Sequence, residues 1–351
     1  MAERQLPYRV PAPEPHALLH WPDAFGTRFT VFIDTEEEFD WTKPFSRDAR
    51  GTNHMRALPA AHAWFTARGV PLTCLIDHPI ATCARSVEIL RTMLEDGRSA
   101  VGTQLHPWVS PPFDEDVSIL NSFAANLPHG LEEAKLTLLT TLITDAIGVQ
   151  PRIYRAGRYG IGPDTPAMLS RLGYRLDSSM RAGYDYSRAG GPDFTRIGNQ
   201  PFGLMPGLSE LPLTTVYTGH ARRGGAGLHR WLGTLPRGRG IASRLGLFSR
   251  VALTPEDMPL DDVLEAVRVA AGEGVRLLNF SFHSPSLEPG HTPYVRTEAD
   301  LAAFYRWWEG VLAELDRLKI APASLDQIID ALDAACGPTA TSASAGSAGG
   351  L

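Results

Sequence analysis

The sequence predicts an α/β fold, a distorted (β/α) barrel of about seven strands. Short apolar runs alternate with segments whose apolar residues follow the helical period, a pattern that favours a parallel sheet covered by helices. Apolar residues make up 43% of the 351 residues, which is enough for one sizeable core. About seven strands in a chain of this length favour closure into a barrel over an open sheet.

Each expected element follows from its local pattern. The strands are short apolar runs, at 28–34, 70–77, 100–106, 152–155, 174–177, 210–214 and 275–283. The helices have apolar residues at helical spacing, and several stop at a glycine; they are expected at 55–68, 87–95, 131–147, 163–172, 260–271 and 298–318. The segments 181–202 and 219–250 interrupt this alternation, so we expect two long excursions from the barrel.

The chain is expected to divide into a barrel and three accessory parts. Residues 1–27 are an N-terminal extension, and residues 28–335 are the barrel, with an arginine-rich insertion at 219–250. The tail at 336–351 is small and polar in composition, which predicts disorder.

The charge, the cysteines and the hydropathy of the sequence give no indication of a nucleic-acid partner, a cysteine-based site or a membrane-spanning segment. The net charge of −6 gives no general reason to expect a nucleic-acid partner. The three cysteines match no zinc or redox spacing, and Cys74, inside an apolar run, is expected to be a buried free thiol. The first residues lack an apolar signal core and no run of about 18 apolar residues occurs, so a cytoplasmic location is expected.

Polar residues follow six of the expected strands. The clusters lie at 34–41, 77–79, 104–108, 155–160, 177–179 and 283–285. Because the carboxyl ends of parallel strands meet at one edge of such a fold, these clusters are expected to converge on one catalytic mouth.

Two acids of the first cluster suggest a cation nearby. Asp34 and Glu36 lie two residues apart, so in an extended segment they point to the same side. Two carboxylates this close are costly to ionise together unless a metal ion or Arg155 lies beside them. Arg155 itself ends a buried strand and needs an anion, which either Asp34 or Asp177 would provide.

Two histidines complete the candidate site. His283 ends a strand and is well placed for proton transfer. His106, two residues before Trp108, is either a site residue or a core histidine packed on the tryptophan. The other acids of the first cluster are expected to be solvated or structural: Glu37, Glu38 and Asp40.

Six segments carry a family resemblance: VFIDTEEEFDW at 31–41, VGTQLHPWVSPP at 101–112, YRAGRYG at 154–160, YRLDSSM at 174–180, SELPLTT at 209–215 and NFSFHSPSLEPGHTPY at 279–294. In this order and spacing they resemble the NodB-homology polysaccharide deacetylases, carbohydrate esterase family 4, and within them the WalW-like branch associated with lipopolysaccharide biosynthesis. The resemblance implies a distorted (β/α) barrel of about seven strands. It also implies removal of an acetyl group from a sugar with the help of a divalent metal, often zinc.

The resemblance implies a role for each candidate residue. Asp34 looks like the general base, and Arg155 looks like the arginine that holds it. Glu36 looks like the metal-binding acid, with His106 as a second ligand, and His283 looks like the general acid that protonates the leaving amine. Five residues are expected to contact substrate: Gln104, Trp108, Arg158, Tyr159 and Asp177.

The second motif departs from the family pattern. The family has histidines where this chain has Gln104 and Trp108, and only His106, which the WalW-like branch shares, remains. Zinc prefers imidazole and thiolate and needs at least three protein ligands, so Glu36 and His106 leave the site one ligand short. His78, after the second expected strand, is the candidate for the third ligand.

The sequence therefore predicts a hydrolase that cleaves the acyl-amide C–N bond of an acylated sugar or glycan precursor. In one version a divalent metal, expected to be zinc, polarises the carbonyl group and activates water. In a metal-poor version Asp34 still activates water, while Arg155, Gln104 and His106 stabilise charge. The alternatives are an inactive site and a carbohydrate-binding pseudoenzyme with a degenerate metal site.

The arginine-rich insertion has three interpretations. Between Leu211 and Pro255 the chain has seven arginines and no acid: Arg222, Arg223, Arg230, Arg237, Arg239, Arg244 and Arg250. The segment is a solvated loop, a site for an anionic group such as phosphate or a glycan carboxylate, or a contact for lipid headgroups. The lipid interpretation arises because large apolar side chains are interspersed with the arginines.

Overall fold

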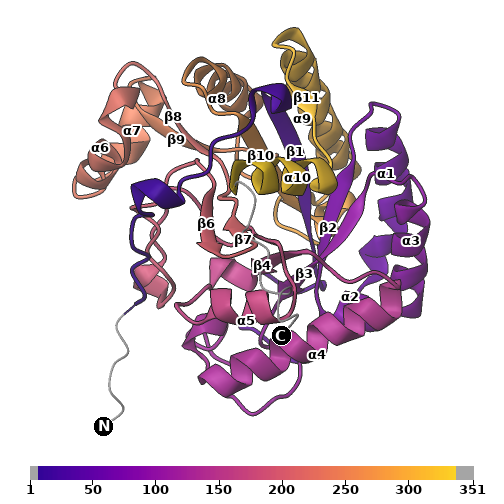
Figure 1. Ribbon diagram of the computed structural model, residues 1–351. Helices are drawn as coiled ribbons and strands as arrows, with labels where there is room; N and C mark the ends of the chain where they lie inside the picture. The colour runs from indigo at the N-terminus through magenta and orange to yellow at the C-terminus, as the bar shows by residue number, and fades with distance from the viewer. Residues whose placement is uncertain (1–6, 337–351) are drawn as a thin grey trace, which may run out of the picture.

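The computed structural model describes residues 7–336, which form a curled sheet with helices packed on its outer face (Figure 1). The strands are β1 (Arg28–Thr35), β2 (Leu72–Ile76), β3 (Ala100–Leu105), β4 (Ile153–Ala156), β5 (Leu176–Asp177), β6 (Phe202–Met205), β7 (Leu208–Glu210), β8 (Thr215–Thr218), β9 (Ser249–Ala252), β10 (Leu277–His283) and β11 (Ala321–Pro322). The α-helices are α1 (Leu58–Thr66), α2 (His78–Thr82), α3 (Ala84–Leu94), α4 (His129–Ile147), α5 (Thr165–Arg171), α6 (Gly225–Leu232), α7 (Gly238–Arg244), α8 (Leu260–Gly272), α9 (Glu298–Arg317) and α10 (Leu325–Cys336).

Seven strands pair in parallel, in the order β10-β1-β2-β3-β4-β5-β7, with β6 antiparallel at one edge and β11 beside β1. The predicted distorted barrel of about seven strands is confirmed. The strands β7 and β10, at the two ends of this parallel order, are not paired with each other. The side chain of Thr214, which follows β7, forms hydrogen bonds with the backbone of β10. The Thr214 hydroxyl accepts a hydrogen bond from the backbone N–H of Asn279 at 2.9 Å and donates to the carbonyl oxygen of Leu277 at 3.5 Å.

Most predicted elements are confirmed within a few residues. The helices α2 and α10 and the strand β6 were not predicted, and two of the predicted regions differ. The strand expected at 210–214 lies earlier, as β7, because the residues after it form separate hydrogen bonds, such as Leu213 N to Met180 O, instead of a regular ladder. The excursion at 219–250 is not a loop: it folds as α6 and α7, carried on the antiparallel ribbon of β8 and β9. Both helices are short, at eight and seven residues, and each contains two glycines, which are poor helix formers, so the composition did not predict them.

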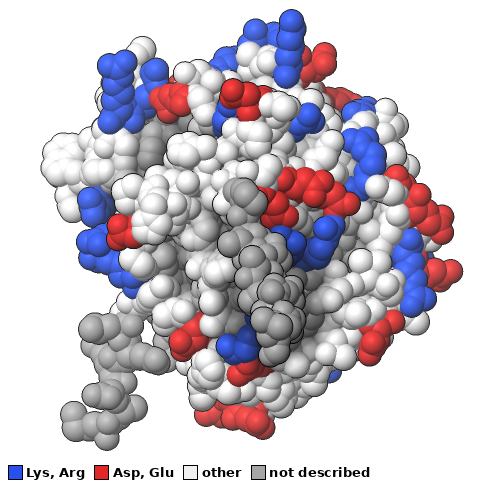
Figure 2. Space-filling model, in the orientation of Figure 1, with Lys and Arg blue, Asp and Glu red and all other residues white. Residues whose placement is uncertain are grey.

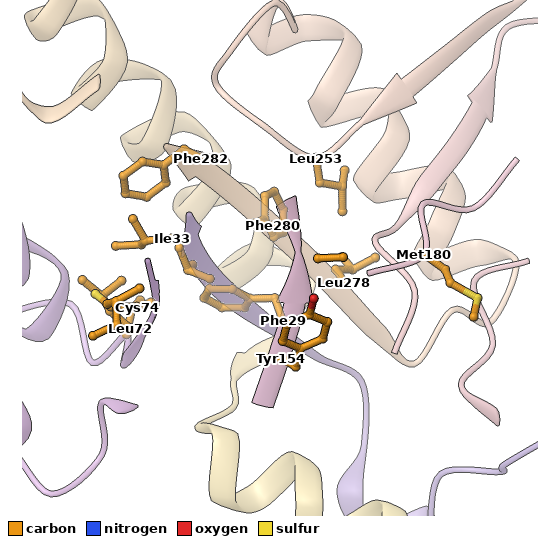
Figure 3. Close-up of a cluster of buried hydrophobic side chains, with 14 of the residues drawn as sticks. Phe29, Ile33, Leu72, Cys74, Tyr154, Met180, Leu253, Leu278, Phe280 and Phe282 are labelled. Atoms are coloured by element: carbon orange, nitrogen blue, oxygen red, sulfur yellow. The ribbon is translucent and has the colours of Figure 1, made fainter. Parts of the chain in front are cut away.

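Two hydrophobic clusters lie on the two faces of the sheet. On β1 the side chains alternate, so Val31 and Ile33 join the outer cluster under the helices, while Phe32 joins the inner one. Figure 3 shows part of the outer cluster, in which Ile33 of β1, Cys74 of β2 and Phe282 of β10 lie together. Cys74 is fully buried and free, as predicted.

The helix α10 covers the amino ends of the strands. Its Leu325 and Ile328 belong to the inner cluster, and its Asp326 and Asp333 form ion pairs with Arg152 before β4 and Arg175 before β5. The opposite end of the barrel, at the carboxyl ends of the strands, is therefore not covered by α10 and can carry polar side chains.

The proposed domain division stays a prediction. Leu19 and Phe25 of the N-terminal extension pack into the inner cluster, and most of the predicted disordered tail lies outside the described residues. Within residues 7–336, no helix combines the length and the apolar composition that crossing a bilayer requires.

Candidate active site

A cavity of about 380 Å³ opens among the carboxyl ends of the strands and gathers most of the predicted site residues. The pleat of β1 places Asp34 on the same side as Phe32, toward the barrel interior. On β3 and β10 the same alternation turns Gln104 and His283 inward. The predicted residues that line the cavity are Asp34, Glu36, Gln104, His106, Trp108, Arg158, Tyr159 and His283.

A buried ion pair holds Asp34. Nη1 of Arg155 lies 2.5 Å from Oδ1 of Asp34, and the side chains are 0% and 4% exposed. The remaining N–H groups of Arg155 donate to the carbonyl and hydroxyl oxygens of Ser178. Of the two partners that the sequence left open for Arg155, the ion pair is with Asp34.

Asp177 does not line the cavity, which corrects the prediction that it contacts substrate. It pairs in register with Tyr154 of β4, whose side chain belongs to the outer cluster, whereas its neighbour Leu176 points inward. Asp177 accepts a hydrogen bond from the Ser179 hydroxyl, and it pairs in register with Glu210 of β7. Burial raises the pKa of Asp177 to about 6 and raises that of Glu210 well above its ordinary value.

Glu256 orients and charges His283. Oε2 of Glu256 lies 2.6 Å from Nδ1 of His283, and Oε1 accepts the backbone N–H of the same residue at 3.1 Å. Burial disfavours the imidazolium, but Glu256, Glu36 and Asp34 outweigh it and raise the pKa of His283 to about 10. The other ring nitrogen, Nε2, lies 3.8 Å from Oδ2 of Asp34, and the side chain lines the cavity.

Glu36, Gln104 and His106 line the same cavity, and their donor atoms are of the kinds that divalent metals bind. Within the described part of the chain, Oε1 of Glu36 and Oε1 of Gln104 are buried without a hydrogen-bond partner, which is costly unless a cation or water satisfies them. Nε2 of His106 lies 3.5 Å from Oε2 of Glu36. Burial raises the pKa of Glu36 to about 8, against the opposing effects of His283 and His106, so its carboxylate gains from a cation. Two oxygens and one imidazole suit several divalent ions.

Behind His106, Glu37 fixes the orientation of the ring. Oε2 of Glu37 lies 2.8 Å from Nδ1 of His106, and Oε1 accepts the indole N–H of Trp108 at 2.7 Å. Glu37 is fully buried and therefore structural, not solvated. A carboxylate on Nδ1 is the arrangement that typically points the Nε2 of a metal-binding histidine at its ion.

Glu37, Asp77 and His106 also bring ligand atoms within 4.8 Å of one another. Their oxygens are already occupied, however, since Asp77 accepts the backbone N–H groups of Glu37 and Ile80. Neither acid lines the cavity. This second cluster therefore fits a supporting hydrogen-bond network better than a metal site.

The other predicted residues have distinct places. His106 satisfies both of its interpretations, because it lines the cavity and stacks on Trp108 with ring centroids 4.3 Å apart. A Cβ at Gly157 would lie 2.4 Å from Cδ2 of His106, so a glycine is needed there. His78 begins α2 and does not line the cavity, which removes it as the third ligand.

Sequence reasoning missed Glu256 and Arg181. Glu256 follows β9, a strand in the arginine-rich segment that the sequence did not predict. It was therefore not recognised as a residue that follows the end of a strand. Arg181 lines the cavity four residues beyond the end of β5, in a segment without regular secondary structure.

No protein-family model matches the chain, and no curated protein does. Solved structures match it over most of its length. A Mycobacterium smegmatis protein assigned as a polysaccharide deacetylase aligns with a TM-score of 0.51 and 17% identity, over 92% of this chain and 95% of its own. Puue allantoinase aligns with a TM-score of 0.49 and 16% identity, over 97% and 99%. A Pseudomonas aeruginosa PAO1 protein, also assigned as a polysaccharide deacetylase, aligns with a TM-score of 0.47 and 15% identity, over 91% and 93%. The first of these likenesses shows the barrel fold.

Proposed function

We propose that this protein is a hydrolase that cleaves the acyl-amide C–N bond of an acylated sugar. The observation that carries the proposal is the pairing of an arginine-held carboxylate with a carboxylate-held imidazole in one cavity. Oδ2 of Asp34 and Nε2 of His283 lie 3.8 Å apart, so both groups face the same small volume. The barrel that this chain shares with a protein assigned as a polysaccharide deacetylase supports the proposal by analogy.

The two groups divide the proton transfers of hydrolysis. Asp34, oriented by Arg155, accepts a proton from water as the water oxygen adds to the carbonyl carbon. His283 donates its Nε2 proton to the amide nitrogen as the C–N bond breaks, so a carboxylic acid and a free amine leave. Each such transfer contributes about 10²–10⁴-fold to a rate.

Glu36, Gln104 and His106 would hold the divalent metal that the family resemblance implies, with zinc the expected ion. When bound, such an ion polarises the carbonyl group and stabilises negative charge on its oxygen. Glu37 would keep His106 in the tautomer that leaves Nε2 free for the ion. An oxygen from Gln104 in place of an imidazole weakens the preference for zinc over harder ions.

The proposed substrate is an acylated glycan or glycan precursor of carbohydrate or lipopolysaccharide metabolism. The motifs that resemble the WalW-like branch support this choice. The cytoplasmic location stays a prediction from the sequence.

A carbohydrate-binding pseudoenzyme is the second candidate, and Gln104 is the observation that favours it. In that case the cavity would bind sugar without turnover. The acid–base pair of Asp34 and His283 favours the enzyme, because binding alone requires no proton donor aimed at a carboxylate.

Release of acetate from N-acetylated oligosaccharides tests the proposal, with protein as purified, after chelation, and after addition of zinc, manganese or magnesium. We expect turnover by the wild type and a loss of about 10²–10⁴-fold in Asp34→Asn. Asp48→Asn, at an exposed acid, is the matched control and keeps wild-type rates. Sugar binding without turnover under every metal condition would overturn the enzyme and support the pseudoenzyme.

A further inference from the structure

We infer that the cavity contains a subsite for an anionic group on the substrate, built on Arg181 and Arg158. The inference rests on the proposed function and names the substrate class: an acylated sugar that bears a carboxylate or a phosphate. Both arginines line the cavity that holds Asp34 and His283.

Arg181 has aromatic neighbours but no counter-ion. Its guanidinium carbon lies 4.0 Å from the ring centroid of Tyr184 and 5.6 Å from that of Tyr159, and its Nη1 lies 3.5 Å from the hydroxyl of Tyr186. No carboxylate of residues 7–336 lies within ion-pair distance of it. Aromatic faces hold a guanidinium in place, yet they leave its N–H groups without the anion that a partly buried charge favours.

Arg158, which follows the end of the neighbouring strand β4, also has an aromatic neighbour and no counter-ion. Its guanidinium carbon lies 4.1 Å from the ring centroid of Phe123, and its Nη1 donates to the hydroxyl of Ser122. Among the described residues it also has no acidic partner. Arg158 and Tyr159 both have positive φ angles, of 54° and 63°, a costly backbone conformation that tends to persist at functional sites.

Apart from Glu36, the other charged groups in and beside the cavity have charge partners. Arg155 pairs with Asp34, Glu256 with His283, and Asp40 with Lys43 at 3.1 Å. Glu36 belongs to the metal-binding group. The cavity therefore offers two uncompensated guanidinium groups, whose planar forks match carboxylate and phosphate oxygens.

A third arginine strengthens the positive potential at this side of the cavity. Arg250 of β9 stacks on the ring of Tyr184 at 3.5 Å from its centroid, and it donates to the carbonyl oxygen of Gly183. Tyr184 is therefore contacted by two guanidinium groups, one of which lines the cavity.

Calorimetric binding of three sugars tests the subsite: N-acetylglucosamine, its 6-phosphate and N-acetylglucosaminuronic acid. We expect at least one of the two anionic sugars to bind wild type at least about tenfold more tightly than the neutral one, with a preference that weakens as salt rises. Arg181→Gln removes this preference, and Arg158→Gln reduces it. Arg188→Gln, at an exposed arginine outside the cavity, is the control and keeps it.

Equal affinity of wild type for all three sugars would overturn the subsite, and so would an undiminished preference in folded Arg181→Gln. Circular dichroism establishes folding, and if Arg181→Gln does not fold, Arg158→Gln and the salt dependence decide. Failure of the proposed function has a different signature: anion preference is retained, but no sugar is deacetylated. Deacetylation with equal kcat/KM for neutral and anionic sugars would remove the subsite and leave the function.

A different surface carries a second proposal. The insertion lobe, residues 219–250, stands out from the barrel as α6 and α7 (Figure 1). It has a small core of its own, formed by Leu232, Ala242 and Phe248. It exposes five large apolar side chains: Trp231 (56%), Leu235 (42%), Ile241 (53%), Leu245 (64%) and Leu247 (44%).

We propose that the insertion lobe docks on an anionic lipid bilayer. The segment 219–250 contains no acid, and five of its arginines are exposed and complement negative headgroups: Arg223, Arg230, Arg237, Arg239 and Arg244. Its exposed apolar side chains are suited to the acyl boundary. Figure 2 shows the lobe, at the left of the view, as largely uncharged surface with Lys and Arg beside it. Ile241 and Leu245 lie four residues apart at α7, so they share one side of the helix.

Sedimentation with vesicles tests the docking. We expect the protein to pellet with phosphatidylglycerol–phosphatidylcholine vesicles at low salt and to stay in solution with pure phosphatidylcholine. The combined substitution Trp231→Ser, Ile241→Ser and Leu245→Ser abolishes pelleting, whereas Ile119→Ser with Leu120→Ser, at exposed apolar residues elsewhere, does not. Protein that remains in the supernatant with the anionic vesicles would overturn the proposal.

Discussion

Nδ1 of His283 lies 2.6 Å from Oε2 of Glu256, a residue 27 positions earlier in the chain. The carboxylate fixes the orientation of the imidazole, so that the opposite nitrogen faces Asp34. It also stabilises the imidazolium, which keeps the proposed general acid protonated. Glu256 touches no reacting atom and is therefore a positioning residue.

Replacing Glu256 by Gln shifts the alkaline limb of the activity profile to lower pH. Glu256 raises the pKa of His283, which is about 10 in the wild type, so removing the negative charge makes His283 lose its proton earlier. The measurement is kcat/KM against pH, and Asp261→Asn, at an exposed acid of α8, is the control. If the alkaline limb of the kcat/KM profile does not move in Glu256→Gln, the contact between Glu256 and His283 has no role in catalysis.

The same pair makes stability depend on alkaline pH. The pKa of His283 is about 10 in the folded chain against 6.5 ordinarily, so between these values the folded state binds more protons than the unfolded state. The contribution is therefore complete below pH 6.5 and declines as pH rises toward about 10. Urea unfolding at several pH values checks it, since the difference between wild type and Glu256→Gln should shrink on the alkaline side. A difference that grows there would contradict the assignment.

Replacing Gln104 by His increases zinc affinity by at least about tenfold, because imidazole is a better zinc ligand than an amide oxygen. Gln104 Oε1 is buried without a hydrogen-bond partner among the described residues, so the substitution sacrifices no bond of that atom. Competition with a chromogenic chelator measures the affinity, and Gln150→His, at an exposed glutamine, is the control. Unchanged affinity would place the metal elsewhere.

Replacing Lys135 by Met destabilises the protein by about 3–5 kcal/mol, the usual cost of breaking a buried ion pair from one side. Nζ of Lys135 donates to the carbonyl oxygens of Pro107, Ser110 and Pro112, at 3.1, 2.6 and 2.6 Å, and lies 3.0 Å from Glu115. These contacts hold the loop that follows His106. Urea denaturation gives the difference, and Lys319→Met at an exposed site should change stability by less than about 0.5 kcal/mol.

Iodoacetamide should modify Cys83 in preference to Cys74, with a rate that rises through about pH 7. Burial opposes the Cys83 thiolate, but hydrogen bonds from Ser86, Thr52 and the backbone at the start of α3 outweigh it and lower the pKa of Cys83 to about 7. Cys74 is buried, which raises the pKa of its thiol to about 12. Mass spectrometry locates the label, and labelling of Cys74 in the folded protein would contradict the described core.

Local patterns determined most of the barrel and three members of its site. Asp34, Arg155 and His283 each stand at the end of an apolar run, and in a parallel sheet all such ends meet. The register confirms the convergence, since Asp34 and His283 are direct partners between β1 and β10, and Gln104 and Arg155 between β3 and β4. The length of an apolar run, its period and the polar residue at its end depend on a few consecutive residues, so the sequence alone revealed them.

Only the tertiary structure determined which side chains pair with one another and to which face of the sheet each side chain points. Asp177 stands at a strand end like Asp34, but the pleat of β5 turns it to the outer face, and no local signal sets that phase. Glu256 meets His283, and Glu37 meets His106 from 69 residues away, because loops and register bring distant segments together. Period and composition depend on neighbours along the chain, whereas charge pairing depends on neighbours in space, and only the folded packing defines those.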